Sequence, residues 1–586
     1  MSKGFTLIET LIALGIFVII ATGVYFSYSN LLEIFSASYL NLTALSALDN
    51  ELEIAHNMPY SDLGVQGGSP AGVIVSPKNV TYGNINFVVT TVVRNIDDPF
   101  DGLQGGNPDD TAPADYKLVQ IEITCPACPR FIPARSTTTI APPGLETVTK
   151  KGTLIVKALN ASGQPISGAN VSIVNTKVNP TININDITDV TGVLKLVDIA
   201  TSSAGYSITV TKSGYSTDRT YPPGGVSNPN PLKPDATVLS QKVTEISFVV
   251  DLVSTLNVGT QDEFCAGTGN IDFLQTGQKL IGTNPNVLKY SVSHTTDAGG
   301  DLSLSGLEFD TYNFQNQDPD YELSGFSPIM PIAVDPNGTY SLTWLMALKN
   351  PSAVVITVKD KNTGQLINDA EVELTKSGFA DKKYTGRKFL THTDWSNGQY
   401  DSKSSNLEVD SPAGELHIVQ VGGKYASMSD EWLISKTIDF GTQTVTFYNL
   451  LWNPVSQPPQ AGSNSLKIQI ATNNDDSNWN FIGPDGTANS YYTSSDIQLH
   501  SSHNNNRYLR YKIILRTDNQ NYTPSLQDLT LHFHSSCVFD GQVYFSGLNQ
   551  ATYKITVEKT GYKKFTDTGV KLDSSWKDYR MVLTPL

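Results

Sequence analysis

The first stretch of the chain is apolar enough to cross a membrane, yet it contains an acidic residue. Residues 5–26 hold a single charged side chain, Glu9, among aliphatic, aromatic and small residues. About 20 apolar residues are enough for a helix to span a bilayer. A carboxylate in hydrocarbon costs at least a few kcal/mol unless it finds a partner. We therefore expect a membrane helix in which Glu9 has a functional role.

The sequence around Glu9 resembles a known processing signal. A four-residue leader with one basic residue ends at Gly4, and Phe-Thr-Leu-Ile-Glu follows at positions 5–9. This pattern is similar to the prepilin signal of type IV pilins and type II secretion pseudopilins. The resemblance implies that a prepilin peptidase cuts between Gly4 and Phe5 and that Phe5 is then N-methylated. It also implies that Glu9 pairs with the N-terminal ammonium of a neighbouring pilin subunit. The alternatives are an ordinary signal anchor or, less favoured, a cleaved secretory signal.

The membrane segment continues into a longer helix. No proline interrupts residues 5–57, and apolar residues recur at amphipathic spacing from Leu31 to Leu52, so one helix is expected over this range. Pro59 then ends it. Strands are expected at 72–75, 85–93 and 116–123. A helix followed by antiparallel strands is the pilin arrangement, and we assign 5–135 to a pilin-like domain whose membrane span is 5–26.

Composition favours β-sandwich modules with polar loops. The 586 residues imply several domains, only 16% are charged, and the net charge is −16. No basic patch stands out, so nucleic acid is an unlikely partner. There is no second apolar stretch of membrane length, and Lys3 suits an N-terminus on the inner side. We expect one pass through the cytoplasmic membrane with the remainder outside, at the cell surface or in a pilus after assembly.

A polar, proline-containing linker at 136–150 precedes a repetitive region. The expected boundaries are a leader at 1–4, a first module at 151–250, a second at 251–350 and a third at 351–450. Tyr206–Tyr215 matches Tyr553–Tyr562, and Leu154–Ile173 parallels Val355–Leu374, with strand-type alternation between glycine turns. These segments resemble carboxypeptidase regulatory-like β-sandwiches, a scaffold and not an activity. The fold class is therefore multidomain and mainly β, behind a long N-terminal helix.

Residues 459–534 differ from the repeats and resemble a galactose-binding-like jelly roll. The segment 535–586 resumes the regulatory-like pattern but lacks a first half. We expect that residues 440–452 supply that half, which would make the jelly roll an insertion in the last module.

The jelly-roll resemblance suggests sugar binding. Exposed aromatic side chains stack on sugar rings, and the candidates are Trp479, Tyr491, Tyr492 and Arg507. The alternative is that such aromatics fill the sandwich core. No catalytic motif is found, so no enzyme activity and no catalytic residue are expected. Asp475, Asp476 and Asp485 are interpreted as turn residues.

Metal and disulfide sites are weakly indicated. The acidic loop 97–115 either binds a structural Ca²⁺ or is a solvated turn, and otherwise no cofactor or metal is expected. His532 and His534 share a strand face and are interpreted as surface histidines. Cys125 and Cys128 form either a local disulfide or two thiols. Cys265 and Cys537 share a sequence spacing that suggests equivalent positions in related modules, and their pairing is left open.

Together these features favour a minor pilin or pseudopilin-like subunit that displays adhesive β modules. Its expected partners are other pilin subunits, the prepilin peptidase, the membrane and glycans of other cell surfaces. Two alternatives stay open: a membrane-anchored carbohydrate-binding protein that does not polymerise, and a secreted polysaccharide-active enzyme.

Overall fold

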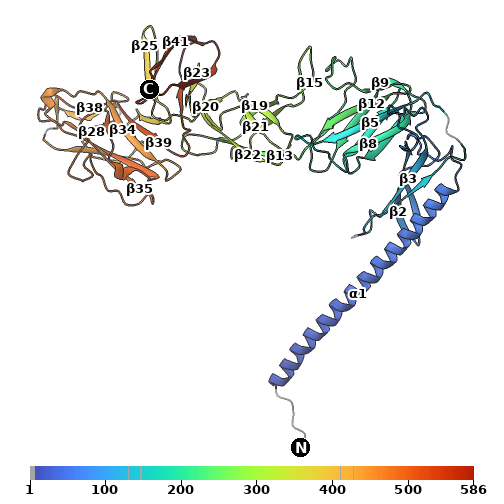
Figure 1. Cartoon of the computed structure of the whole chain (residues 1–586). Coiled ribbons are helices and arrows are strands. Elements are labelled where there is room, and N and C mark those ends of the chain that lie inside the picture. The colour runs from blue at the N-terminus through green and yellow to red at the C-terminus, as the bar shows by residue number, and fades with distance from the viewer. Residues whose placement is uncertain (1–6, 130, 145–147, 410, 427) are drawn as a thin grey trace, which may run out of the picture. The chain divides into compact units, whose positions relative to one another are not determined.

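The computed structural model describes residues 7–129, 131–144, 148–409, 411–426 and 428–586. The protein is multidomain and mainly β, with one long N-terminal helix (Figure 1). It divides into two compact units, which are described separately. One unit runs to Val253 and also contains Lys279–Lys289 and Gly306–Phe309. The other contains Ser254–Gln278, Tyr290–Ser305 and Asp310–Leu586.

The helix α1 spans Leu7–His56, close to the range expected from the sequence. At 1.5 Å per residue, its 50 residues extend over about 75 Å. Its C-terminal part packs on a sheet through small and aliphatic residues at helical spacing, namely Ala44, Ala47, Leu48 and Ala55. The N-terminal part of α1 has no such cover.

The sheet beneath α1 has four antiparallel strands in the order β1-β2-β3-β4. The strands are β1 (Lys78–Tyr82), β2 (Ile85–Ile96), β3 (Tyr116–Thr124) and β4 (Ala134–Ile140). Buried residues alternate along β2 and β3 and face the helix. The strand expected at 72–75 is instead an irregular segment in which Ile74 forms an isolated bridge with Val65.

The linker begins later than expected, because β4 lies within the range assigned to it. Ser136–Thr139 pairs with β3, where Thr137 lies opposite Gln120. Threonine is favoured in strands, and this edge strand alternates between partly buried and exposed residues. The polar composition that suggested a linker is that of a sheet edge.

The first module is a sandwich of two sheets, with strand orders β12-β5-β8 and β10-β9-β6-β7 and with β11 paired to β9. Its strands are β5 (Gly152–Leu159), β6 (Asn170–Asn175), β7 (Ile182–Ile187), β8 (Val193–Ile199), β9 (Ser202–Thr211), β10 (Asp218–Arg219), β11 (Ala236–Val238) and β12 (Val243–Val249). The first strand β5 lies between antiparallel β8 and parallel β12. Tyr206 and Phe248 are fully buried in the core of this first module.

The second module repeats this arrangement, with sheets β18-β13-β22-β20 and β17-β14-β19-β21. Its first strand again has a parallel partner, since β13 pairs with β22. A separate hairpin, β15-β16, belongs to the first compact unit. The strands are β13 (Ser254–Gln261), β14 (Asp272–Gly277), β15 (Leu280–Gly282), β16 (Val287–Leu288), β17 (Ser291–Thr295), β18 (Asp301–Leu307), β19 (Asp310–Asn316), β20 (Tyr321–Ser327), β21 (Ile332–Val334) and β22 (Thr339–Leu348).

The third module is built from two distant parts of the chain. Its sheets are β40-β23-β43 and β25-β24-β41-β42, and β43 again runs parallel to the first strand β23. The strands are β23 (Ala353–Asp360), β24 (Glu371–Lys376), β25 (Phe379–Tyr384), β40 (Gln542–Phe545), β41 (Ala551–Glu558), β42 (Phe565–Leu572) and β43 (Trp576–Leu583). The first half is therefore supplied by 353–384, and not by 440–452 as the sequence suggested.

A second sandwich fills the interval between β25 and β40 and is called the inserted sandwich below. Its strands are β26 (Lys388–His392), β27 (Tyr400–Lys403), β28 (Leu407–Glu408), β29 (Leu416–Ile418), β30 (Gln420–Val421), β31 (Lys424–Tyr425), β32 (Glu431–Ser435), β33 (Ile438–Asp439), β34 (Thr446–Asn453), β35 (Leu466–Asn473), β36 (Ile497–Gln498), β37 (Tyr508–Leu515), β38 (Ser525–Leu526) and β39 (Asp528–His534), with 3₁₀ turns at Pro459–Ala461 and Ser501–His503. It is larger than the expected 459–534, since β26 pairs with β39 and β32 with β37. Residues 388–450 thus belong to this sandwich and not to the third module.

The insertion point corresponds to one turn of the first module. There, Thr188 begins the turn from β7 to β8, accepts a hydrogen bond from the Ala169 amide and donates one to the Ile166 carbonyl. Thr385 has the same role after β25, with Ala370 and Ile367 as its partners. A short turn in the first module is replaced by a whole domain in the third.

Candidate functional site

The exposed half of α1 is the first candidate site. Apolar side chains from Leu7 to Phe35 are about half or more exposed on all sides of the helix, including Leu7 at 80% and Ile19 at 73%. The helix is long and apolar enough to cross a membrane, judged by length and composition. A helix that is apolar all round is suited to lipid or to burial among other helices.

Two hydroxyls within this apolar segment are hydrogen-bonded to the helix itself. The hydroxyl of Thr22 donates to the Val18 carbonyl at 2.6 Å, and that of Ser27 donates to the Gly23 carbonyl at 2.8 Å. Such bonds to the preceding turn remove the cost of unpaired hydroxyls in hydrocarbon. Gly4 and Phe5, the expected processing residues, lie outside the described residues, as does the side chain of Glu9.

The other half of α1 is fixed to its sheet by a partly buried ion pair. Glu51 is 6% exposed on the packed face of the helix, and its carboxylate lies 2.7 Å from the Lys78 ammonium of β1. Lys117 of β3 donates to the carbonyl oxygens of Tyr60 and Leu63, in the segment that follows the helix. Burial lowers the pKa of Lys117. These contacts join helix, sheet and connecting loop into one domain.

The acidic loop 97–115 uses its carboxylates within the protein. Asp97 is fully buried and lies 2.6 Å from Lys195 of the first module. Asp98, Asp109 and Asp110 accept hydrogen bonds from backbone amides of the same loop. Among the described residues, no group of three or more His, Cys, Asp or Glu is arranged to hold a metal ion. Whether the loop binds Ca²⁺ or is a solvated turn stays open.

This loop and β2 also join the domain of α1 and β1–β4 to the first module. Arg94 makes a bidentate ion pair with Asp186 of β7. The side-chain amide of Asn95 donates to the Val197 carbonyl. The Thr153 hydroxyl donates to Gln104 Oε1 at 2.6 Å. Because β7 is the last strand of its sheet, this contact covers one sheet edge.

The four sugar-binding candidates are not equivalent in the structure. Tyr492 is fully buried in the core of the inserted sandwich, and its hydroxyl accepts from the His500 amide, so it cannot contact a sugar. Trp479 is partly exposed, and the Arg510 guanidinium lies 4.7 Å from its ring centroid. Tyr491 is partly exposed with the Lys467 ammonium at 5.0 Å. Trp479 and Tyr491 are thus partly exposed, and each ring has a cation over it.

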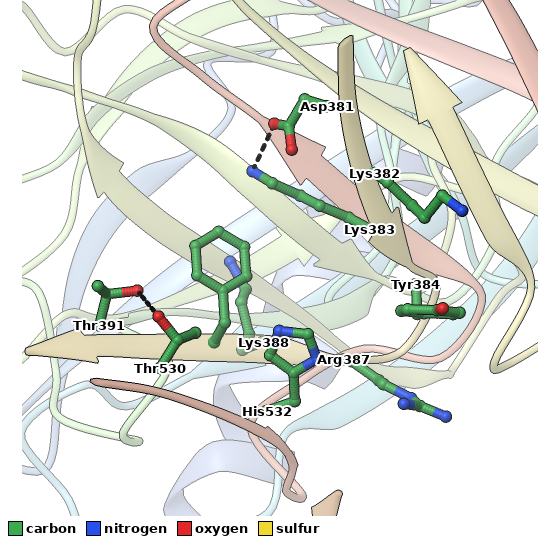
Figure 2. A pocket seen from close by; sticks show the side chains of 10 residues that line it. Asp381, Lys382, Lys383, Tyr384, Arg387, Lys388, Thr391, Thr530 and His532 are labelled. Carbon is green, nitrogen blue, oxygen red and sulfur yellow. Dashed lines mark hydrogen bonds and ion pairs between the residues drawn. The ribbon is translucent and has the colours of Figure 1, made fainter. Parts of the chain in front are cut away.

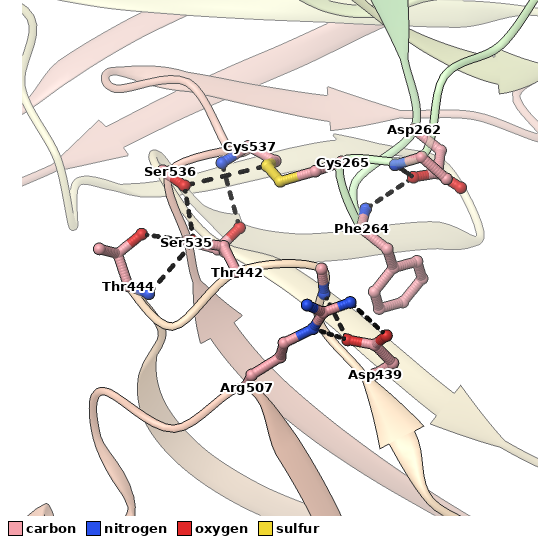
Figure 3. Close-up of a disulfide and its surroundings, with 12 residues drawn as sticks. Asp262, Phe264, Cys265, Asp439, Thr442, Thr444, Arg507, Ser535, Ser536 and Cys537 are labelled. Carbon is pink, nitrogen blue, oxygen red and sulfur yellow. Dashed lines mark hydrogen bonds and ion pairs between the residues drawn. A yellow bond between two sulfur atoms is a disulfide. The ribbon is translucent and has the colours of Figure 1, made fainter. Parts of the chain in front are cut away.

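Arg507 is engaged with a carboxylate. Its guanidinium makes two hydrogen bonds to Asp439, at 2.7 and 2.8 Å (Figure 3). This partner holds the pKa of Asp439 below its usual range. A bidentate pair of this kind leaves the guanidinium less available to a sugar hydroxyl.

The other polar candidates have structural roles. Asp475 and Asp485 accept hydrogen bonds from the backbone amides of Ser477 and Thr487, as expected for turn residues. Asp476 instead accepts from the Thr437 hydroxyl. His534 is hydrogen-bonded to the Gly386 carbonyl through Nδ1 at 2.7 Å.

Both cysteine pairs are disulfides. Cys125 and Cys128 close a short loop after β3. Cys265 and Cys537 join the β13–β14 turn of the second module to the segment between β39 and β40 (Figure 3). Cys265 precedes β14, which lies in the sheet opposite the first strand of its module, whereas Cys537 precedes β40, which pairs with the first strand β23, so their shared spacing does not reflect equivalent positions. Phe264, next to Cys265 in the chain, packs against the inserted sandwich. Its ring centroid lies 5.8 Å from that of Phe440 and 5.9 Å from that of Phe533.

Comparison with known proteins identifies the N-terminal segment. A family model described as the prokaryotic N-terminal methylation motif matches residues 1–25. No curated protein matches the chain.

Solved structures show only weak likeness. The Bacillus anthracis TIE protein is 12% identical over 53% of this chain, with a TM-score of 0.16, and the chain spans 64% of that protein's length. The shaft pilin SpaA from Lactobacillus rhamnosus GG is 10% identical over 34% of this chain and 98% of its own, with a TM-score of 0.15. A streptococcal ancillary pilin is 10% identical over 74% and 99%, with a TM-score of 0.13. TM-scores this low support no conclusion about shared fold or function.

Proposed function

We propose that this chain is a minor subunit of the type IV pilin or pseudopilin class, which assembles through α1 and displays its β modules for adhesion. The observation that carries the proposal is the contrast along α1. Its second half is packed on a sheet, while its first half presents apolar side chains in every direction, and the methylation motif over residues 1–25 covers most of that half. A helix of this kind is stable in a membrane and equally stable in a bundle of identical helices.

Lipid alone does not explain an acidic residue in this segment. Apolar side chains gain little on moving from lipid to a helix bundle, so polar pairing must contribute to specificity. Removal of the leader after Gly4 would create an ammonium group at Phe5. In this proposal, that group meets Glu9 of a neighbouring subunit and fixes the axial register of the filament.

The modules suit display better than chemistry. Three sandwiches, in each of which the first strand lies between two strands and runs parallel to one of them, form most of the chain together with the inserted sandwich of the last one. We propose that they have no enzymatic role and that their polar surfaces contact glycans or other surfaces. So large a cargo is hard to place at every step of a filament, and this favours a minor or tip position.

The decisive experiment is the chemistry of the mature N-terminus. Mass spectrometry of the protein from its native cells should show a chain that begins with N-methylated Phe5. Glu9→Ala should leave processing and membrane insertion intact and strongly reduce incorporation into filaments. An uncut leader would refute the proposal.

A non-polymerising surface anchor is the second candidate, because the length and composition of α1 suit a simple membrane span equally well. In that case Glu9→Ala would change neither abundance nor location.

Finding the protein at one copy per filament step would refute the minor position. Turnover of polysaccharides by the full chain would favour the enzyme alternative.

A further inference from the structure

A recess of about 220 Å³ lies where the inserted sandwich leaves the third module. Its walls are the end of β25, the start of β26 and the facing strand β39 (Figure 2). The lining residues are Asp381, Lys382, Lys383, Tyr384, Arg387, Lys388, Phe389, Thr391, Thr530 and His532. Four of these ten side chains are cations, and Asp381 is the single carboxylate among them.

Two of the four cations are neutralised by partners. The Lys382 ammonium lies 2.7 Å from Glu371 and is about half exposed. The Arg387 guanidinium pairs with Asp369 at 2.7 Å and lies 3.7 Å from the Tyr448 ring centroid. These two side chains are held by the protein and are not the basis of the inference.

Lys383 and Lys388 are less well compensated. The Lys383 side chain is 14% exposed, and its ammonium donates to the Tyr544 carbonyl at 3.1 Å while Asp381 lies 3.6 Å away. The Lys388 ammonium donates to the Ser324 hydroxyl at 3.3 Å and forms no ion pair with a carboxylate of the described residues. Both lie near Tyr544, so two positive charges share one poorly hydrated region.

The electrostatic cost of this arrangement is visible in both groups. Burial lowers the pKa of Lys388 to about 8, with Glu263 raising it and the charge of Lys383 lowering it further. Burial also lowers the pKa of Lys383, against the effect of Asp381. A desolvated cation without a counter-ion is stabilised by any anion that can reach it.

The rest of the recess supplies contacts for a larger group. The hydroxyls of Thr391 and Thr530 lie 2.9 Å apart on one side (Figure 2). The Phe389 ring is 42% exposed and packs under the Lys383 ammonium, 4.5 Å from its centroid. His532 is partly buried beside Phe389, and burial lowers its pKa, which favours the neutral ring.

We propose that this recess binds a carboxylate or phosphate group carried by a sugar, with Lys388 and Lys383 as its counter-ions. The hydroxyl pair and the exposed aromatic ring would contact the sugar that bears the anion. The size of the recess fits one such group and not an extended chain. This site does not depend on filament assembly, so its failure and that of the proposed function are distinguishable.

The test is calorimetric titration of the full chain in a nonionic detergent at pH 7. The probes are glucuronate for the carboxylate, glucose 6-phosphate for the phosphate, and glucose as the neutral control. At least one anion should bind, more weakly as salt is raised, and glucose should not. Equal binding of glucose and both anions, or binding of none of them, would overturn the proposal.

Variants test the residues. Lys388→Gln should weaken anion binding by roughly tenfold, since charge-assisted contacts are among the strong ones. Asp381→Asn keeps the shape and removes the competing negative charge, so it should tighten binding roughly threefold. Lys571→Gln on β42 removes a lysine that is 70% exposed and should change nothing.

If Lys388→Gln does not fold, as judged by thermal unfolding, the Asp381→Asn variant decides. An unchanged or weaker affinity of Asp381→Asn would contradict the proposal. Unchanged affinity in a folded Lys388→Gln variant would contradict it as well.

Discussion

Lys195 of β8 lies 2.6 Å from Asp97, whose side chain is fully buried at the end of β2. This pair joins the domain of α1 and β1–β4 to the first module. Asp97 also accepts a hydrogen bond from the backbone amide of Gln104. The same carboxylate therefore also holds the acidic loop. The loop is therefore joined to the first module through Asp97, while the other aspartates that accept hydrogen bonds are held by amides of the loop itself.

Asp97→Asn should loosen this joint. The variant removes the charge and leaves the Lys195 ammonium facing a neutral group, which should cost about 1–3 kcal/mol. Thermal unfolding of the full chain in detergent should show the loss, and hydrogen exchange should rise in loop 97–115 and β8. Glu122→Gln is the control, since its partner Arg135 is 59% exposed, and it should cost less than about 0.5 kcal/mol. Equal effects of the two variants would argue against a coupling role.

The disulfide between Cys265 and Cys537 should contribute strongly to the second unit. The two residues are 272 positions apart, and closing a loop of that length removes much conformational freedom from the unfolded chain. The double variant Cys265→Ser, Cys537→Ser should lose about 2–5 kcal/mol in thermal or urea unfolding. The matched control removes Cys125 and Cys128, which are only 3 positions apart, and should lose less. A larger loss in the control would mean that loop closure is not the dominant effect.

Local patterns in the sequence predicted local structure well. The helix expected at 5–57 is observed at 7–56, because helical spacing of apolar residues depends only on near neighbours. The mainly β class and the repeated modules also follow from strand alternation and turn residues. Gly4, Phe5 and Glu9 stay predictions of the sequence, supported by the methylation motif.

Long-range pairings could not be predicted in the same way. The third module pairs β23 with β40 and β24 with β41, and nothing in the sequences of β23 and β24 signals that these partner strands lie beyond an inserted domain. The turn that carries the insertion keeps Thr385 but lacks the aspartate that follows Thr188 in the first module. Predicting the Cys265–Cys537 disulfide would have required knowing that the β13–β14 turn lies beside the segment between β39 and β40.

Tyr491 and Tyr492 show that sequence alone does not predict which of two adjacent aromatic residues is buried. Neighbouring residues in an extended segment face opposite sides, so one of two adjacent aromatics is buried and the other is not. Sequence alone does not fix which one. The structure buries Tyr492 and leaves Tyr491 partly exposed.

This difference gives a test of sugar binding by the inserted sandwich. Tyr492→Ala should destabilise the domain by about 3–5 kcal/mol, because it empties a core position. Tyr491→Ala should leave stability within about 0.5 kcal/mol. If the surface of the inserted sandwich binds glycans, Tyr491→Ala and Trp479→Ala should reduce glycan-array signals while the unfolding temperature is retained. Unchanged signals in both folded variants would remove these residues from the candidate site.

The inserted sandwich should also lose stability in mild acid because of His503. This side chain is 1% exposed, its Nδ1 lies 3.1 Å from the Thr472 hydroxyl, and burial lowers its pKa to about 4. The unfolded chain binds this proton near pH 6.5 and the folded one only near 4, so stability is full above 6.5 and falls as the pH drops towards 4. The loss from His503 should approach roughly 3 kcal/mol. The lowered pKa values of His392 and His532 act in the same direction.

Urea unfolding of wild type and His503→Gln between pH 7 and 4.5 measures this loss of stability, and the variant should show a shallower decline. Parallel declines would mean that another group controls the acid response.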